Sequence, residues 1–108
     1  MSHQHKDLAA GRWAQMSFAE QMANVGSEVS RALKWKAKNN LDYSRQAGVR
    51  ALELMDLTLA HTRVFSRLRE VARTREILVD YFLGTNEYHS TEANLQKYFL
   101  AFNFLVRR

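Results

Sequence analysis

The 108 residues of the chain include no proline and only four glycines, at positions 11, 26, 48 and 84. Proline ends or kinks a helix and glycine destabilises one, so a chain that lacks the first and rarely uses the second can carry long, uninterrupted helices. Sandwiches and barrels need many turn residues, and this chain has few of them. The sequence therefore predicts an all-α protein.

Apolar residues recur at spacings of three and four along most of the chain, which is the period of amphipathic helices. Four helices are expected, over residues 17–38, 41–61, 62–83 and 91–107. Ser17 and Glu20 fit a capping box that starts the first of them, with an earlier start near Trp13 as the alternative. Neither glycine nor proline forces a turn between His61 and Thr62, so one long helix there is also compatible with the sequence.

Four helices of this length with short connections typically pack as an antiparallel up-down four-helix bundle. We expect residues 13–108 to form one such domain, because a chain of this length usually folds as a single domain. Residues 1–12 are polar and hold two of the four histidines. They are expected to form a flexible polar arm.

The composition also bears on where the protein works. It has no cysteine, which excludes disulfides and zinc–thiolate sites and fits a reducing compartment. The longest strongly apolar stretch, residues 98–106, is about half the length that crosses a bilayer, and the first residues lack an apolar signal core. We therefore expect a cytoplasmic protein with no membrane partner. Its net charge of +5 is compatible with nucleic acid or with an acidic protein partner.

No set of residues typical of a catalytic or cofactor site stands out. Carboxylate-bridged metal bundles need a glutamate followed three residues later by a histidine, and this spacing does not occur in the chain. There is no glycine-rich phosphate loop and no evident serine–histidine–carboxylate set. We expect a non-enzymatic protein that holds no metal and no cofactor. Residues 84–89, a loop in which titratable groups cluster, are the alternative place for chemistry.

Two of the expected helices carry apolar residues on a second face. Leu54 and Leu57 lie off the main apolar stripe of their helix, and Leu100 and Phe104 lie mostly off that of the last helix. A monomeric bundle needs only one apolar stripe per helix, and a small chain has little room for a central helix. We therefore predict a homo-oligomer with these four residues at its interface. The alternative is a monomer with broad, half-buried stripes.

The third expected helix holds the densest positive charge, with arginines spaced by four so that pairs share a face. Arginine suits the planar geometry of phosphate contacts. With the last two residues of the chain, these arginines are the candidates for binding nucleic acid: Arg63, Arg67, Arg69, Arg73, Arg107 and Arg108.

The same helix also fits a different interpretation. Glu70, Glu76 and Asp80 are interleaved with the arginines at helical contact distance, which is typical of a solvated ion-pair network. Three more cations would extend a basic patch only if the fold brings them near the arginines: Lys34, Lys36 and Lys38.

Three stretches of the chain resemble small bacterial all-helical proteins with no assigned activity: GRWAQMSFAEQMANVGSEV (11–29), RALELMDLTLA (50–60) and FLGTNEY (82–88). In size, charge and helix count, the chain also resembles the ribosomal-RNA intervening-sequence proteins and the accessory proteins of diversity-generating retroelements. The latter resemblance implies a basic, ring-forming bundle that engages a reverse transcriptase and RNA. Neither resemblance assigns a functional residue.

Two functions remain open on the sequence alone. The first is a non-enzymatic homo-oligomeric interaction module, which the surplus apolar residues and the missing catalytic sets favour. The alternative is a basic RNA- or DNA-binding accessory protein that uses the arginines named above.

Overall fold

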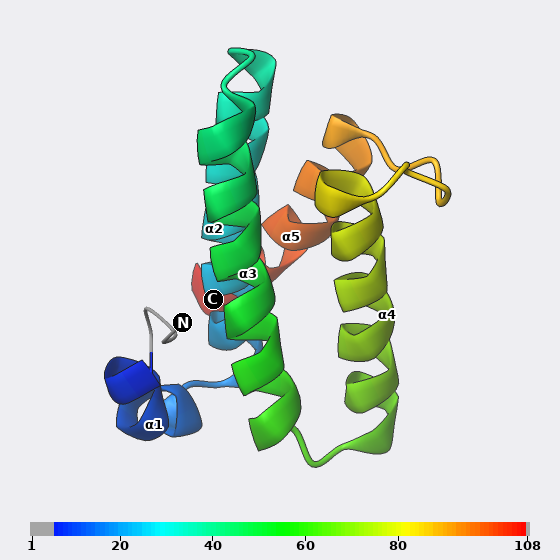
Figure 1. Cartoon of the computed structure of the whole chain (residues 1–108). Helices are drawn as coiled ribbons and strands as arrows, with labels where there is room; N and C mark the ends of the chain where they lie inside the picture. The colour runs from blue at the N-terminus through cyan, green and yellow to red at the C-terminus, as the bar shows by residue number, and fades with distance from the viewer. Residues whose placement is uncertain (1–5, 108) are drawn as a thin grey trace.

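A computed structural model of the chain describes residues 6–107, with side chains described from residue 11 onward. These residues form five α-helices and no β-strand (Figure 1). The helices are α1 (Lys6–Gln15), α2 (Phe18–Ala37), α3 (Leu41–His61), α4 (Phe65–Leu83) and α5 (Glu92–Arg107). The prediction of an all-α protein is confirmed.

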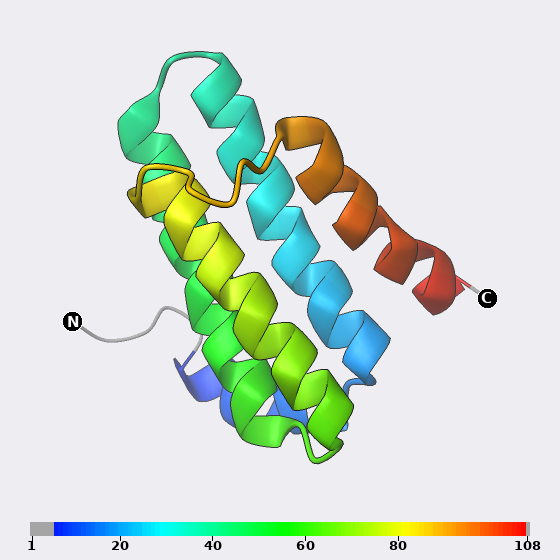
Figure 2. The ribbon, with the colours of Figure 1, turned by 90° about the vertical axis from the view of Figure 1, so that its right-hand side faces the viewer.

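The centre of the fold is the antiparallel pair of α2 and α3, which share the largest contact among the described helices. α4 packs on α3 and α5 packs on α2, each antiparallel to the helix that it covers (Figure 1 and Figure 2). α1 packs on α3 from the side opposite α4. α5 begins near the end of α4 and runs obliquely behind α2, so its second half lies away from α4 (Figure 1). These contacts are compatible with an up-and-down bundle.

The ends of α2 and α3 are set by short-range hydrogen bonds that the sequence encodes. The Ser17 hydroxyl accepts from the Glu20 N–H at 3.1 Å, and the Glu20 carboxylate accepts from the Ser17 N–H at 2.8 Å. This confirms the capping box. Asn40 caps α3 by accepting from the Tyr43 N–H. Asn39 before it adopts a left-handed φ of 64°, which asparagine tolerates better than most residues and which turns the chain between the two helices.

Residues 62–64 separate α3 from α4, so the alternative of one continuous helix is wrong. Thr62 leaves the helical conformation, and its hydroxyl donates to the Thr58 carbonyl at 2.6 Å. The Arg63 guanidinium donates to the Ala60 carbonyl at 3.0 Å. Two side chains therefore satisfy carbonyls that the end of α3 leaves without helical partners.

Helix α1 occupies part of the segment that the sequence assigns to a polar arm over residues 1–12. The helix reaches back to Lys6, while residues 1–5 lie outside the described residues. Trp13 anchors it: the residue is 5% exposed, and its Nε1–H donates to the Thr58 hydroxyl at 3.2 Å. The Gln21 side chain in turn donates to the Trp13 carbonyl at 2.8 Å. A large buried ring and two hydrogen bonds thus fix the end of a segment whose polar composition indicated an arm.

The core lies where α2, α3, α4 and α5 face one another. Its most completely buried large side chains are Met22, Leu33, Met55, Leu78, Val25, Val29 and Val71. Gly26 lets α5 approach α2 closely, because a Cβ at this position would lie 2.8 Å from the Cβ of Phe99. The position of α5, and therefore of its outer face, depends on this glycine.

Candidate interaction surfaces

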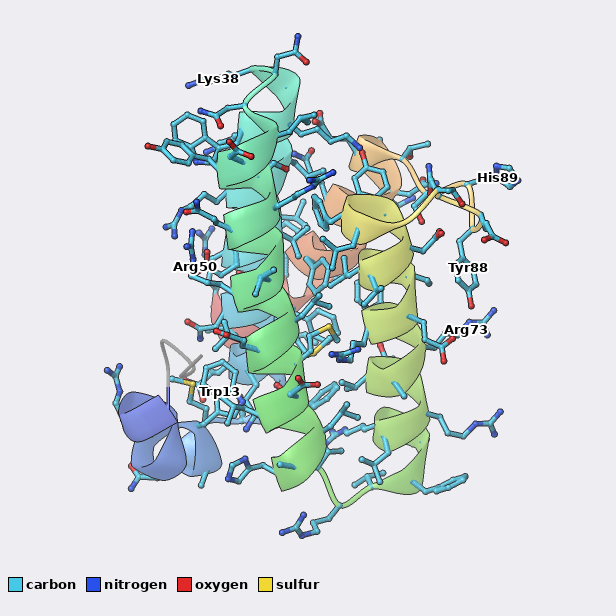
Figure 3. The ribbon with its side chains drawn as sticks, viewed as in Figure 1. Trp13, Lys38, Arg50, Arg73, Tyr88 and His89 are labelled. Carbon is cyan, nitrogen blue, oxygen red and sulfur yellow. The ribbon has the colours of Figure 1, made fainter. Side chains whose placement is uncertain are left out.

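The second apolar face of α3 is covered by α1. Leu54 is only 4% exposed, and Leu57 is half-buried against the core. Thr58, one turn after Leu54, holds the Trp13 ring through its hydroxyl, and Figure 3 shows Trp13 between α1 and α3. Leu54 is therefore not available to a second chain in this structure. The sequence analysis placed residues 1–12 in an arm and Trp13 only at a possible helix start, so it did not predict a helix over α3.

The second apolar face of α5 is open. Leu100 is 50% exposed and Phe104 is 61% exposed, as an interface with another molecule requires. Leu105 and Val106 are also about half exposed, because α5 continues beyond its last buried residue, Phe102. We call Leu100, Phe104, Leu105 and Val106 the α5 outer surface: Leu100 and Phe104 share one face of the helix, and Leu105 and Val106 lie around its exposed end.

A groove runs between α2 and α5 next to this surface. It has a volume of about 460 Å³. Small residues of α2, Gly26, Ser27 and Ser30, line one wall, and Leu100 and Asn103 of α5 line the other. The groove therefore continues the α5 outer surface into a concave region with apolar and polar walls.

The candidate arginines do not form one surface. Arg63 binds a carbonyl at the end of α3, and the Arg67 guanidinium lies 4.9 Å from the centre of the Phe18 ring. Arg69 lies beside Phe65, and Arg73 points away from the rest of the molecule on the far side of α4 (Figure 3). The exposed Arg107 is at the end of α5, away from α4, and Arg108 lies outside the described residues. The lysines near the end of α2 are at the opposite end of α2 from Phe18, so they do not extend the α4 arginines.

The acidic residues of α4 contact tyrosines and backbone groups rather than arginines. Glu70 accepts from the Tyr98 hydroxyl of α5 at 2.6 Å, and Glu76 accepts from the Tyr88 hydroxyl at 3.1 Å. Asp80 accepts from two backbone N–H groups of the loop that follows α4, at 2.7 and 2.9 Å.

The ion-pair network expected within α4 is therefore absent from the described residues. The three ion pairs found among them are Arg31–Glu28, Arg50–Glu28 and Arg75–Asp56. In α4 only Arg75 takes part, and it pairs across to α3. The arginines expected in the network, Arg69 and Arg73 among them, have no carboxylate within ion-pair distance.

The two tyrosines that contact α4 carry perturbed acidities. Burial, together with the hydrogen bond to Glu70, raises the pKa of Tyr98 well above its usual 10.0. The hydrogen bond to Glu76 and the charge of that carboxylate raise the pKa of Tyr88. Both phenols therefore remain protonated donors across the physiological range.

The loop between α4 and α5 is held by its own hydrogen bonds. Asn86 accepts from the Ser90 N–H at 2.8 Å and donates to the Ser90 carbonyl at 3.0 Å. Asn86 and His89 both have left-handed φ angles. Glu87, Tyr88 and His89, where polar groups cluster in the sequence, are exposed to solvent.

A third surface, which sequence reasoning did not single out, lies on the α2–α3 pair. We define the hairpin surface by these residues: Arg31 and Trp35 on α2, Lys38 directly after it, and Tyr43 and Arg50 on α3. Figure 3 shows Lys38 and Arg50 on the opposite side of the molecule from Arg73. The spacings of three, four and seven were visible in the sequence. Only the fold shows that the two helices present them on the same side.

No helix within residues 6–107 is long and apolar enough to cross a membrane. The chain matches no protein-family model, no curated protein and no solved structure. The resemblances drawn from the sequence therefore stay predictions, and a functional proposal must rest on the α5 outer surface, the α4 arginines and the hairpin surface.

Proposed function

We propose that the protein is a non-enzymatic interaction module that forms homo-oligomers through the α5 outer surface. Its unit is an antiparallel four-helix bundle of α2 to α5, with α1 as a cover on α3. The observation that carries the proposal is the exposure of Leu100 and Phe104, 50% and 61%, on a helix whose opposite face is buried. The lack of cysteine fits a site of action in the cytoplasm.

The apolar area available on α5 is large enough to matter. A whole phenylalanine side chain offers about 200 Å², so the four half-exposed residues around the end of α5 present on the order of 400 Å² in total, about half of it from Leu100 and Phe104 on one face. That is comparable with the largest apolar patch of a typical monomer, which is often functional. A standard interface buries roughly 800 Å² per partner. The adjoining groove between α2 and α5 would supply the remainder.

Light scattering after size-exclusion chromatography, over a range of protein concentrations, tests this proposal. We expect the wild type to form an oligomer and Phe104→Gln to shift it toward the monomer, because the change places an amide in an apolar interface. Phe65→Gln is the matched control, since Phe65 is an even more exposed phenylalanine on another helix. A wild type that stays monomeric at high concentration, or a Phe65→Gln variant that dissociates as readily, contradicts the proposal.

The alternative function is RNA or DNA binding through the arginines of α4, as in an accessory protein of a retroelement reverse transcriptase. One observation favours it: the carboxylates of α4 contact tyrosines and backbone N–H groups, so Arg69 and Arg73 remain free for phosphates. It predicts an affinity that falls steeply with added salt as counterions are released. Arg69→Gln with Arg73→Gln should weaken such binding, and unchanged binding by this double variant would rule out the α4 arginines.

A further inference from the structure

Two aromatic rings on the hairpin surface remain accessible to solvent. Trp35 and Tyr43 come from different helices and meet edge to face, with ring centres 4.8 Å apart. Tyr43 is 49% exposed and Trp35 is half-buried. The two rings therefore form an angled aromatic pair, which we call the step. No described helix covers its outer part.

One cation lies beside these rings, and two more lie on the same faces of α2 and α3. The Lys38 ammonium lies 5.4 Å from the centre of the Trp35 ring. Arg31, one turn before Trp35, and Arg50 of α3 both contact a single carboxylate, Glu28, at 3.0 and 3.4 Å. Arg31 and Arg50 thus share one acidic partner, and Lys38 has no carboxylate within ion-pair distance among the described residues. The Arg31 side chain is 55% exposed, so donors of its guanidinium face solvent.

Arg31, Trp35 and Lys38 lie in a line along one face of α2 and its end, and Tyr43 adds its ring from α3. At about 1.5 Å per residue, Arg31 and Lys38 are roughly 10 Å apart along the helix, with Trp35 between them. A ring flanked by cations at this spacing resembles the arrangement by which proteins hold single strands, where bases stack on aromatic rings and cations follow the backbone.

We propose that the hairpin surface binds single-stranded nucleic acid, with a base stacked on the Tyr43–Trp35 step and phosphates held by Lys38 and Arg31. A duplex would hide its base faces from the rings. An acidic peptide would use the cations but would leave the exposed ring step without a role, so the aromatic residues favour a nucleic acid. This site lies on a different side of the molecule from Arg73, and it does not depend on the α5 outer surface.

Fluorescence anisotropy with labelled oligouridylate and oligothymidylate, in low and high salt, tests the site. Tyr43→Leu keeps the charge and a good helix former, and it should weaken binding on the order of tenfold through loss of stacking. Lys38→Gln and Arg73→Gln each remove one positive charge from an exposed position. Lys38→Gln should weaken binding and lower the slope of log affinity against log salt by about one, whereas Arg73→Gln should do neither.

Trp35 offers an independent signal. Trp13 is buried, so an oligonucleotide that stacks on the step should quench the fluorescence of Trp35 alone, and potassium iodide quenching should identify the same tryptophan. Circular dichroism of Tyr43→Leu checks that its fold is intact. Because Lys38 lies on the surface, its variant keeps the test valid if Tyr43→Leu is unstable. The Phe104→Gln variant should bind the oligonucleotide as the wild type does, which separates this site from self-association.

Three results would overturn the site. They are no binding of either oligonucleotide at low salt, equal losses in the Lys38 and Arg73 variants, and full affinity in a folded Tyr43→Leu variant. Competition by a polyglutamate peptide as effective as that by the oligonucleotide would also overturn it, in favour of an acidic protein partner.

Discussion

Helices α3 and α5 carry the same pattern in the sequence and end in opposite environments. Each has two apolar residues, three or four positions apart, outside its main stripe. On α3 the face that holds Leu54 is covered by α1, whereas on α5 Leu100 and Phe104 stay open to solvent. A second apolar face therefore indicates that something covers a helix. It does not say whether the cover comes from the same chain or from another.

The cover on α3 has a single large anchor. Trp13 is the buried aromatic residue of α1 among the described side chains, and it reaches Thr58 across 45 positions of sequence. Among the described residues, no helix covers the outer face of α5 in this way, and the oblique path of α5 takes its second half away from α4 (Figure 1). The two faces differ in exposure for two reasons: Trp13 anchors a helix over the face of α3, and the oblique direction of α5 leaves its outer face without a neighbouring helix.

The largest expected effect comes from removing the anchor. Trp13→Ala should lower the free energy of unfolding by about 3–5 kcal/mol, because a buried indole and its hydrogen bond to Thr58 are lost. It should also free the α3 face and increase self-association, which would make α3 behave like α5. Urea unfolding and light scattering measure the two effects. Trp13→Phe keeps most of the packing and should cost about 1 kcal/mol, chiefly for the hydrogen bond. An unchanged unfolding midpoint in Trp13→Ala would mean that α1 does not cover α3 in solution.

A direct comparison of the two faces uses one substitution at two sites. Leu54→Ala should cost about 2–4 kcal/mol of stability because it opens a cavity under α1. Leu100→Ala should change monomer stability by less than about 0.5 kcal/mol and should instead weaken self-association. Chemical denaturation at low protein concentration isolates the first effect from the second. Similar costs at both sites would show that the faces are equally covered.

The sequence predicted most of the fold because the determinants of α2 to α5 are local. The Ser17–Glu20 capping box and the apolar stripes act within a few residues of each other. The extent of α1 was not predictable in this way, since its fixed end depends on the contact between Trp13 and Thr58, which are far apart in the chain.

The surfaces were harder to predict for the same reason. The partners of Glu70 and Glu76 are tyrosines 28 and 12 positions away, whereas the helical spacing suggested the arginines next to them. The hairpin surface joins Trp35 to Tyr43 across a turn, and only the pairing of α2 with α3 brings the two rings together. Exposure of Leu100 and Phe104 was predicted because it needed no distant contact.

Gly26 tests how closely α5 must follow α2. Gly26→Ala places a Cβ 2.8 Å from the Phe99 Cβ, and the overpacking should cost about 1–3 kcal/mol, partly offset by the better helix propensity of alanine. Gly11→Ala is the matched control in α1, because nothing lies within 4 Å of its added Cβ. It should be neutral or stabilising by up to about 1 kcal/mol. Thermal unfolding compares the two, and a Gly26→Ala variant as stable as the control would show that α5 can shift without penalty.

The smallest expected effect concerns the polar contact that holds α5 to α4. Tyr98→Phe removes a bond to Glu70 and one from Thr74, so we expect a loss of about 1 kcal/mol at neutral pH. The raised pKa of Tyr98 adds a pH dependence: unfolded tyrosine ionises near 10, whereas the folded residue keeps its proton to higher pH. The stabilisation is therefore complete below about pH 10 and is lost as the pH rises through the folded pKa. Urea unfolding at about pH 9 and pH 11 measures this effect. Between the two pH values, the free energy of unfolding should fall more for the wild type than for Tyr98→Phe, because all other groups titrate in both proteins. Equal losses would mean that the hydrogen bond between Tyr98 and Glu70 does not help to hold α5 to α4 in solution.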